Sequence, residues 1–235
     1  MVARVHWYSG HVAEGWVAVN TWDAMADPAP DPADAVSAAL FVASFAAIVD
    51  PPSAPAHLAR ARRIAGPLAN PALDTQIAYH SGQVERGAGH YNAALAHFHK
   101  AMELAVGTGN LLFEGITLVS LGITAAMTDS DDTEPSLHDA LTQLLATRNW
   151  AFVWVVIEAL ALYWARAGRQ EPAAVLLGHL EANNMRYAQL LEQRRDAVAT
   201  VRAGGDAEDR LAQGAALGRD QLVAYALAQL ADTQH

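Results

Sequence analysis

The chain contains no cysteine among its 235 residues. Disulfide frameworks, cysteine-ligated zinc sites and thiol nucleophiles are therefore excluded, and the composition is typical of a reducing compartment. Lysine is almost absent as well, because every basic residue except Lys100 is an arginine. A P-loop needs a lysine directly after a glycine, and Lys100 follows His99, so this nucleotide-binding loop is excluded too.

Positive charge is scarce: 15 lysine and arginine residues stand against 25 acidic ones, for a net charge of −10. Surfaces that bind nucleic acids or anionic membranes need clustered positive charge, so we expect neither direct nucleic-acid binding nor membrane binding. Residues 1–7 lack the apolar core of a signal peptide. The apolar run 150–165 is short for a membrane span and is interrupted by Glu158. We expect a cytoplasmic location.

The residues that are present indicate helices. Hydrophobic residues make up 52% of the chain and charged residues 17%, which is typical of a folded protein. Apolar residues recur at spacings of three and four, as in Leu95, Phe98 and Met102, whereas runs with period-two alternation are nearly absent. This periodicity predicts an all-α protein.

Helix breakers divide the chain at regular intervals. Prolines, glycines and Asn or Asp clusters leave segments of ordinary helix length between them. The first helices of successive pairs are expected to open near Asp34, Pro71, Gly109 and Asn149, which are 37, 38 and 40 residues apart. This period is close to the helix hairpin of about 34 residues that forms a tetratricopeptide repeat (TPR). It predicts a right-handed α-solenoid of TPR-like helix hairpins, each burying its inner face against the next.

Three parts are expected within one continuous solenoid: a partial first hairpin over 1–30, TPR-like repeats over 31–205 and C-terminal capping helices over 206–235. Gly10 occupies the place of a hairpin turn, which leaves a short first helix over 1–9. We expect the chain to begin inside a longer array. A short capping helix is the alternative.

The segment 82–104 resembles a tetratricopeptide repeat. The matching positions are Gly82, Gly89, Tyr91, Ala94, Phe98 and Ala101. In the repeat family the small residues among these positions allow close helix approach, the positions of Gly89 and Tyr91 shape the turn, and the position of Phe98 fills the gap between successive repeats. The segment departs from the family pattern at Ala78, Glu85 and Val106, where tryptophan, tyrosine and proline are usual.

A second resemblance covers the C-terminal third. Residues 171–182, with the run Ala-Ala-Val-Leu-Leu-Gly, and residues 220–227 resemble stretches of large actinobacterial LuxR-type regulators, as does 7–15 near the N-terminus. In that family a nucleotide-binding switch domain of the STAND ATPase type precedes a helical-repeat region, some members carry a cyclase domain, and a helix-turn-helix domain often follows. The resemblance implies that this chain is the repeat region of such a transcriptional regulator.

Catalytic and metal-binding patterns find little support. Among the histidines, His80, His90, His97 and His99 lie closest in sequence, but their spacing does not bring three onto one helix face. The acidic run 129–134 lacks the glycine and the terminal glutamate of a calcium loop, so a polar turn is expected, with Asp132 or Thr133 as a helix N-cap. We expect no catalytic residue, no metal, no cofactor and no enzymatic activity.

Arginines and tryptophans supply the candidate contacts. Arg60, Arg62 and Arg63 form one basic patch, and Arg194, Arg195 and Arg202 form another. Tryptophans occur at 7, 16 and 22 and again at 150, 154 and 164, and they either fill gaps between hairpins or line a concave groove. The candidate groove or partner contacts are Trp150, Trp154, His80, His97, Arg60 and Arg63.

Two functions follow as hypotheses. The first is a protein-interaction and regulatory domain that docks a protein partner or neighbouring domains of its parent chain. The alternative is a sensing domain that binds a small-molecule effector in the concave groove. The sequence also leaves a homodimer open.

Overall fold

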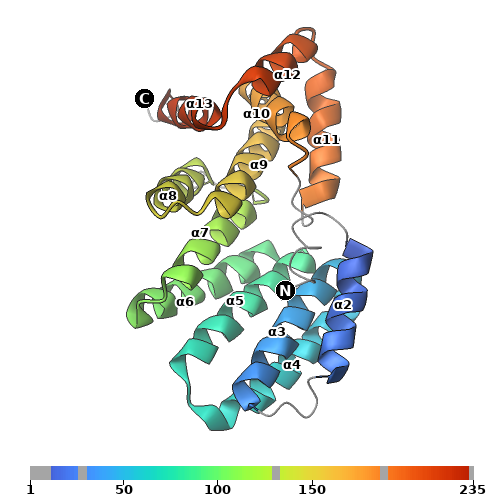
Figure 1. The fold of residues 1–235 in the computed structure, drawn as a ribbon, viewed down its shortest axis with the longest axis vertical. Coiled ribbons are helices and arrows are strands. Elements are labelled where there is room, and N and C mark those ends of the chain that lie inside the picture. The colour runs from blue at the N-terminus through green and yellow to red at the C-terminus, as the bar shows by residue number, and fades with distance from the viewer. Residues whose placement is uncertain (1–11, 26–30, 129–132, 186–189, 233–235) are drawn as a thin grey trace. The chain divides into compact units, whose positions relative to one another are not determined.

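The computed structural model describes residues 12–25, 31–128, 133–185 and 190–232. Within these ranges the backbone forms α-helices and two short 3-10 helices, with no strand (Figure 1). The predicted all-α class is therefore confirmed. The chain divides into two compact units, unit 1 at Met1–Thr128 and unit 2 at Asp129–His235. The divisions predicted at residues 30 and 205 remain predictions.

Unit 1 is built from six described α-helices and the 3-10 helices Pro51–Ser53 and Gly66–Leu68. The α-helices are α2 (Val12–Met25), α3 (Pro32–Val49), α4 (Ala54–Ala65), α5 (Pro71–Gly87), α6 (Tyr91–Thr108) and α7 (Leu111–Ala125). Local signals explain several boundaries. The Asn70 side chain accepts a hydrogen bond from the Ala72 amide at the start of α5, with Pro71 at the first helical position. Gly109 ends α6 in the left-handed conformation, at φ 64°.

In unit 1 the helices α3, α5 and α7 are successive neighbours. Helix α3 packs on α2, α4 and α5, and α5 packs on α6 and α7 (Figure 1). Ten residues of α3 are buried, among them Leu40 and Phe45. By length and composition α3 is also apolar enough to cross a membrane, a test that buried core helices pass as well. Its burial against three neighbours makes it the central core helix of this unit.

The pair α5 and α6 packs through residues that the repeat pattern singled out. Ala94, Phe98 and Ala101 are fully buried on α6. Opposite them lies Gly82, where an added Cβ atom would stand 2.6 Å from the Phe98 ring. The ring therefore occupies the space that any larger residue at position 82 would need.

Unit 2 contains six described helices: α8 (Thr133–Ala146), α9 (Trp150–Arg166), α10 (Gln170–Ala182), α11 (Leu191–Arg202), α12 (Ala207–Ala216) and α13 (Arg219–Ala231). Helix α9 is its core. It contacts α8, α10 and α11 (Figure 1). Eleven of its residues are buried, including Trp164.

Helices α10 and α12 approach each other backbone to backbone. A Cβ atom added to Gly214 would lie 1.8 Å from the carbonyl oxygen of Val175, and one added to Gly178 would lie 2.1 Å from that of Leu211. The two glycines thus let each helix contact the main chain of the other. The Leu-Leu-Gly run of the second resemblance lies on this surface, with Leu176 and Leu177 fully buried.

The helix starts agree with the openings predicted from the breakers. Helices α3, α5, α7 and α9 begin at residues 32, 71, 111 and 150, so successive starts are 39, 40 and 39 residues apart. Each start lies within two residues of its predicted opening. The predicted helix N-cap at Asp132 falls outside the described residues.

Candidate functional site

A row of polar and aromatic side chains follows one face of α5 in unit 1. Gln76, Tyr79, His80 and Gln83 are spaced by three and four residues, which places them along one side of a helix. Helices α3 and α7 flank α5. We call these four residues, with their partners on α3 and α7, the α5 seam.

On the α3 side the α5 seam is closed by two serines. The Ser37 hydroxyl donates to the Gln76 Oε1 at 3.2 Å. Further along α3, the Ser44 Oγ and the His80 Nδ1 are 2.5 Å apart. His80 also packs edge-on against the Tyr79 ring, with the ring centres 5.1 Å apart. The two serine contacts join α3 to α5.

On the α7 side Tyr79 is the centre of the α5 seam. Its hydroxyl accepts hydrogen bonds from the Gln83 Nε2 at 2.7 Å and from the Ser120 Oγ at 3.4 Å. Gln83 also donates to Ser120 at 3.2 Å. The Tyr79 ring packs against Phe98 of α6 and Phe113 of α7, at centroid distances of 5.8 and 5.5 Å. One side chain thus ties three helices together.

Burial divides the α5 seam into an inner and an outer part. Ser44, Gln83 and Ser120 are buried, whereas Gln76, Tyr79 and His80 are half-buried. The outer part offers an amide, a phenol and an imidazole to a ligand, without a net charge when the imidazole is neutral. Such groups can hydrogen-bond to a peptide main chain while the rings supply apolar contact.

Thr117 of α7 lies one turn before Ser120. It is fully buried, and its hydroxyl has no hydrogen-bond partner among the residues that the structure describes. An unpaired hydroxyl in the interior carries a desolvation cost. Thr117 is therefore a weak point beside an otherwise connected polar row.

The predicted contacts in unit 1 are spread over three helices. His80 belongs to the α5 seam, whereas His97 lies half-buried on α6. Arg60 and Arg63 lie on α4, where Arg60 is half-buried and Arg63 is exposed. The seam residues Tyr79, Gln83 and Ser120 were not predicted. The polar spacing of Gln76, Tyr79 and Gln83 along a predicted helix is the signal that could have found them.

Trp150 and Trp154 lie in unit 2, where they begin an aromatic cluster. Their ring centres are 6.1 Å apart. The Trp154 ring stacks on His179 of α10 at 5.4 Å and an interplanar angle of 24°. The guanidinium of Arg219 lies 4.1 Å from the centre of the Trp150 ring. These contacts hold α9, α10 and α13 together, and the pairing of His179 and Arg219 with the tryptophans was not predicted.

The aromatic cluster is anchored by main-chain and charged contacts. The His179 Nδ1 lies 3.1 Å from the carbonyl oxygen of Leu217, between α12 and α13. Arg219 also pairs with Asp220 at 2.9 Å. An arginine and a histidine of the chain itself already cover one face of each indole, so neither of these faces is open to a ligand. This favours a packing role for the pair.

Unit 2 also pairs charges in its interior. The Arg194 guanidinium of α11 donates to the Glu158 carboxylate of α9 at 3.0 Å, and both side chains are at most 9% exposed. Arg194 donates in addition to the Met185 carbonyl oxygen. A second carboxylate, Glu134, accepts hydrogen bonds from the Trp164 indole at 2.7 Å and from Arg169 at 2.8 Å.

Tyr225 of α13 is the described group with a displaced pKa. Burial raises the pKa of its phenol above the ordinary value near 10, and the nearby Glu171 carboxylate raises it further. Arg210 and Arg169 oppose this pKa shift. Tyr225 is therefore held in its neutral form.

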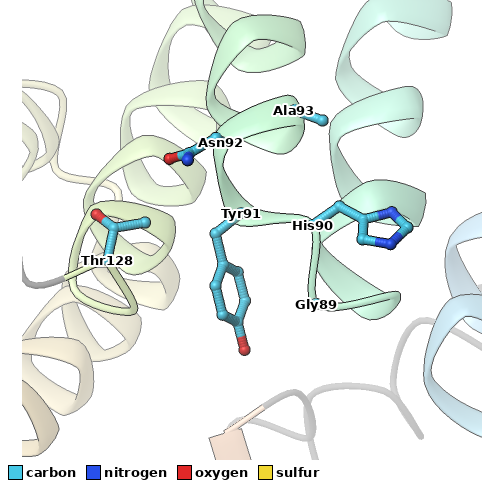
Figure 2. A pocket seen from close by; sticks show the side chains of 6 residues that line it. All are labelled: Gly89, His90, Tyr91, Asn92, Ala93 and Thr128. Atoms are coloured by element: carbon cyan, nitrogen blue, oxygen red, sulfur yellow. The ribbon is translucent and has the colours of Figure 1, made fainter.

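A shallow hollow of about 380 Å³ lies at the turn between α5 and α6. Figure 2 shows its lining side chains: the His90 imidazole and the Tyr91 phenol point in different directions, and Thr128 approaches from the end of α7. His90 is engaged with Glu85 at 2.9 Å. Because the polar groups do not converge on one point, this hollow lacks the geometry of a specific small-molecule site.

The histidines and acidic residues, the N-terminal tryptophans and the acidic run are the remaining candidates from the sequence. In the part of the chain that the structure describes, no three His, Asp or Glu side chains are grouped to hold a metal ion. Trp16 stacks on Phe45 at 6.3 Å. Trp7, the Trp22 side chain and residues 129–132 of the acidic run lie outside the described residues.

The sequence matches no protein-family model, and it matches no curated protein. The two resemblances, to tetratricopeptide repeats and to LuxR-type regulators, therefore remain predictions that rest on the residues quoted for them.

Proposed function

We propose that the chain is a protein-interaction module of TPR-like helix hairpins, which docks a segment of a partner protein or of its parent chain on the half-buried outer part of the α5 seam. The observation that carries this proposal is the row of Gln76, Tyr79 and His80. These side chains stay accessible although their partners on α3 and α7 fix their positions. On this proposal the chain binds a partner and does not catalyse a reaction.

Repetition supports the proposed architecture. The starts of α3, α5, α7 and α9 recur every 39 or 40 residues, close to the period of known helix-hairpin repeats. In unit 1, α3, α5 and α7 are successive neighbours. Equivalent helices that stack in order present one continuous face, which is the surface that solenoid proteins use for binding.

The packing of α5 on α6 supports the TPR-like assignment. Gly82 accommodates the Phe98 ring, and Ala94 and Ala101 are fully buried beside it. These residues occupy the positions at which the repeat pattern requires a small residue or a large ring.

The regulatory role rests on the resemblance of 171–182 and 220–227 to LuxR-type regulators. We include the regulatory role in the proposal because a repeat region in such a regulator serves to hold a partner. A cytoplasmic location is part of the same proposal. The buried Leu-Leu-Gly run of α10 supports a shared way of packing more directly than it supports a shared function.

The α5 seam is testable by site-specific cross-linking in the full parent protein. A photo-reactive residue in place of Gln76 should cross-link to one defined segment, whereas the same residue in place of Lys100, exposed on α6, should not. A synthetic peptide of that segment should then bind the chain. The double change Gln76→Ala and His80→Ala should weaken this binding about tenfold, and Lys100→Ala should leave it unchanged. Equal cross-linking from both positions would contradict the proposal.

A further inference from the structure

Helix α4 concentrates positive charge in an acidic chain. It carries Arg60, Arg62, Arg63 and His57 and no acidic residue, while the whole chain has a net charge of −10. Two of the arginines lie in its last turn, where the helix dipole favours cations. The helix dipole explains the arginines in the last turn. It does not explain why the whole helix lacks acidic residues.

The faces of α4 are sharply divided. Ala54, Leu58, Ala61 and Ala65 are buried on the inner side. The opposite side is a stripe of Ala56, Ala59, Arg60 and Arg63 at helical spacing, in which Arg60 is half-buried and the other three residues are exposed. We call this stripe, with Arg62 at its edge, the α4 basic face. Its small alanines leave room for another helix to approach closely, with guanidinium groups beside the contact.

Several arginines of the chain have carboxylate partners. Arg169, Arg194, Arg202, Arg210 and Arg219 of unit 2 all form ion pairs. By contrast, no carboxylate of the described residues pairs with Arg62 or Arg63. Arg62 instead donates to the uncharged hydroxyl of the buried Ser81 of α5 at 2.9 Å.

We propose that the α4 basic face is a docking surface for an acidic helical segment of a partner protein. Charge complementarity identifies this occupant: carboxylates spaced by three or four residues on the partner meet Arg62 and Arg63, and its small side chains pack on Ala56 and Ala59. The chain as a whole is acidic, so the cluster of arginines on α4 guides an acidic segment to this helix. This surface does not include the α5 seam, so each proposal can fail without the other.

The test uses the purified chain and a labelled, acetylated peptide of alanine with glutamates at helical spacing, with fluorescence anisotropy at low salt as the readout. We expect the acidic peptide to bind and a matched peptide with glutamine for glutamate not to bind. Salt should weaken the binding, since exposed charges are screened. The double change Arg62→Gln and Arg63→Gln should weaken it about tenfold.

The control variant carries Lys100→Gln and Arg195→Gln, which alters the net charge equally at exposed positions outside α4. It should bind the acidic peptide like the unchanged chain. Circular dichroism checks that each variant stays folded. Should loss of the Ser81 contact unfold the double variant, Arg63→Gln alone decides, because Arg63 forms no hydrogen bond or ion pair within the described part of the chain.

Four results would overturn the proposal. The first is no binding of the acidic peptide, and the second is an equal loss in the control variant. The third is tighter binding of inorganic polyphosphate or single-stranded DNA than of the peptide, which would assign the face to phosphate groups. The fourth is a dimer in sedimentation that Arg62→Gln and Arg63→Gln dissociate, which would assign it to a second copy. The α5 seam variants Gln76→Ala and His80→Ala should leave the binding of the acidic peptide unchanged.

Discussion

Unit 1 joins its helices α3, α5 and α7 through the hydrogen bonds of the α5 seam, whereas unit 2 joins its helices through the Glu158–Arg194 ion pair, cation–ring stacks and the close approach of Gly178 and Gly214. Glycine allows close helix approach in both units, since Gly87 of α5 lies against the Ala47 carbonyl of α3. They differ in where the charges go.

Five arginines of unit 2 pair with carboxylates, whereas Arg62 and Arg63 of unit 1 do not within the described part of the chain. Arg194 is buried against a carboxylate, and Arg219 covers an indole ring. Arg62 and Arg63 point from α4 without an acidic partner among the described residues. A charged side chain that already pairs with a carboxylate must lose that pair before it can bind a partner protein, which costs free energy. An exposed side chain without a carboxylate partner, such as Arg63, has no such cost. The comparison is consistent with the proposal that a partner binds unit 1, and the predictions below test the packing of both units.

The largest effect is expected from Arg194→Met. The change removes the Arg194 guanidinium from the buried Glu158 carboxylate, and breaking such a pair costs about 3–5 kcal/mol. Urea unfolding followed by tryptophan fluorescence measures the loss. Replacing both partners, as Glu158→Leu with Arg194→Met, should restore most of the stability because no buried charge then remains. A double variant as unstable as the single one would show that the pair does not act as a unit.

Gly214→Ala should come next. Its new Cβ atom would stand 1.8 Å from the Val175 carbonyl oxygen, so α10 and α12 must move apart, which costs about 3 kcal/mol. Gly107→Ala is the matched control, because Gly107 lies within α6 with nothing within 4 Å of its Cβ position. The control should raise the stability by about 0.5–1 kcal/mol. Thermal unfolding of both variants compares them, and a tolerated Gly214→Ala would contradict the close crossing.

Two substitutions on α7 probe the neutral packing of unit 1. Ser120→Ala removes a partner of both Tyr79 and Gln83 and should lower the free energy of unfolding by about 1 kcal/mol. Thr117→Val, one turn earlier, removes a buried hydroxyl without a partner among the described residues and should raise that free energy by about 1 kcal/mol. Chemical denaturation measures both. If both substitutions changed the free energy of unfolding in the same direction, hydrogen bonding in the α5 seam would not determine the stability of the α5–α7 contact.

Local signals explain what the sequence could predict. Asn70-Pro71, Gly109-Asn110 and Asn149 act on the adjacent backbone, so the helix starts were found within two residues. The packing of Gly82 against Phe98 was also predictable, because the two residues lie in one hairpin with a recognisable pattern.

The candidate sites were less predictable because their contacts join distant segments. Glu158 and Arg194 are 36 residues apart, and no local pattern connects them. His80 and Trp150 were grouped as contacts of one groove, yet the structure places them in different units. Exposure is decided by the neighbouring helices as well. Trp164 is fully buried, whereas Trp150, with the same side chain on the same helix, is half-buried.

The smallest effect is expected at high pH in unit 2. Burial, and then Glu171, raise the pKa of Tyr225 in the folded chain. Below the unfolded pKa of about 10 the phenol is neutral in both states, so its contribution to stability is intact. Above that pH the unfolded chain releases the proton first, and the free energy of unfolding falls until the folded phenol ionises too.

Tyr225→Phe removes this part of the pH dependence. Urea unfolding at several pH values on either side of about 10 should show a shallower decline in the variant than in the unchanged chain. The remaining tyrosines are common to both proteins, so the difference reports Tyr225 alone. Equal slopes would mean that the surroundings of α13 do not hold the phenol neutral. The packing of α13 on the other helices of unit 2 would then depend on the contacts of Arg169 and Arg219 instead.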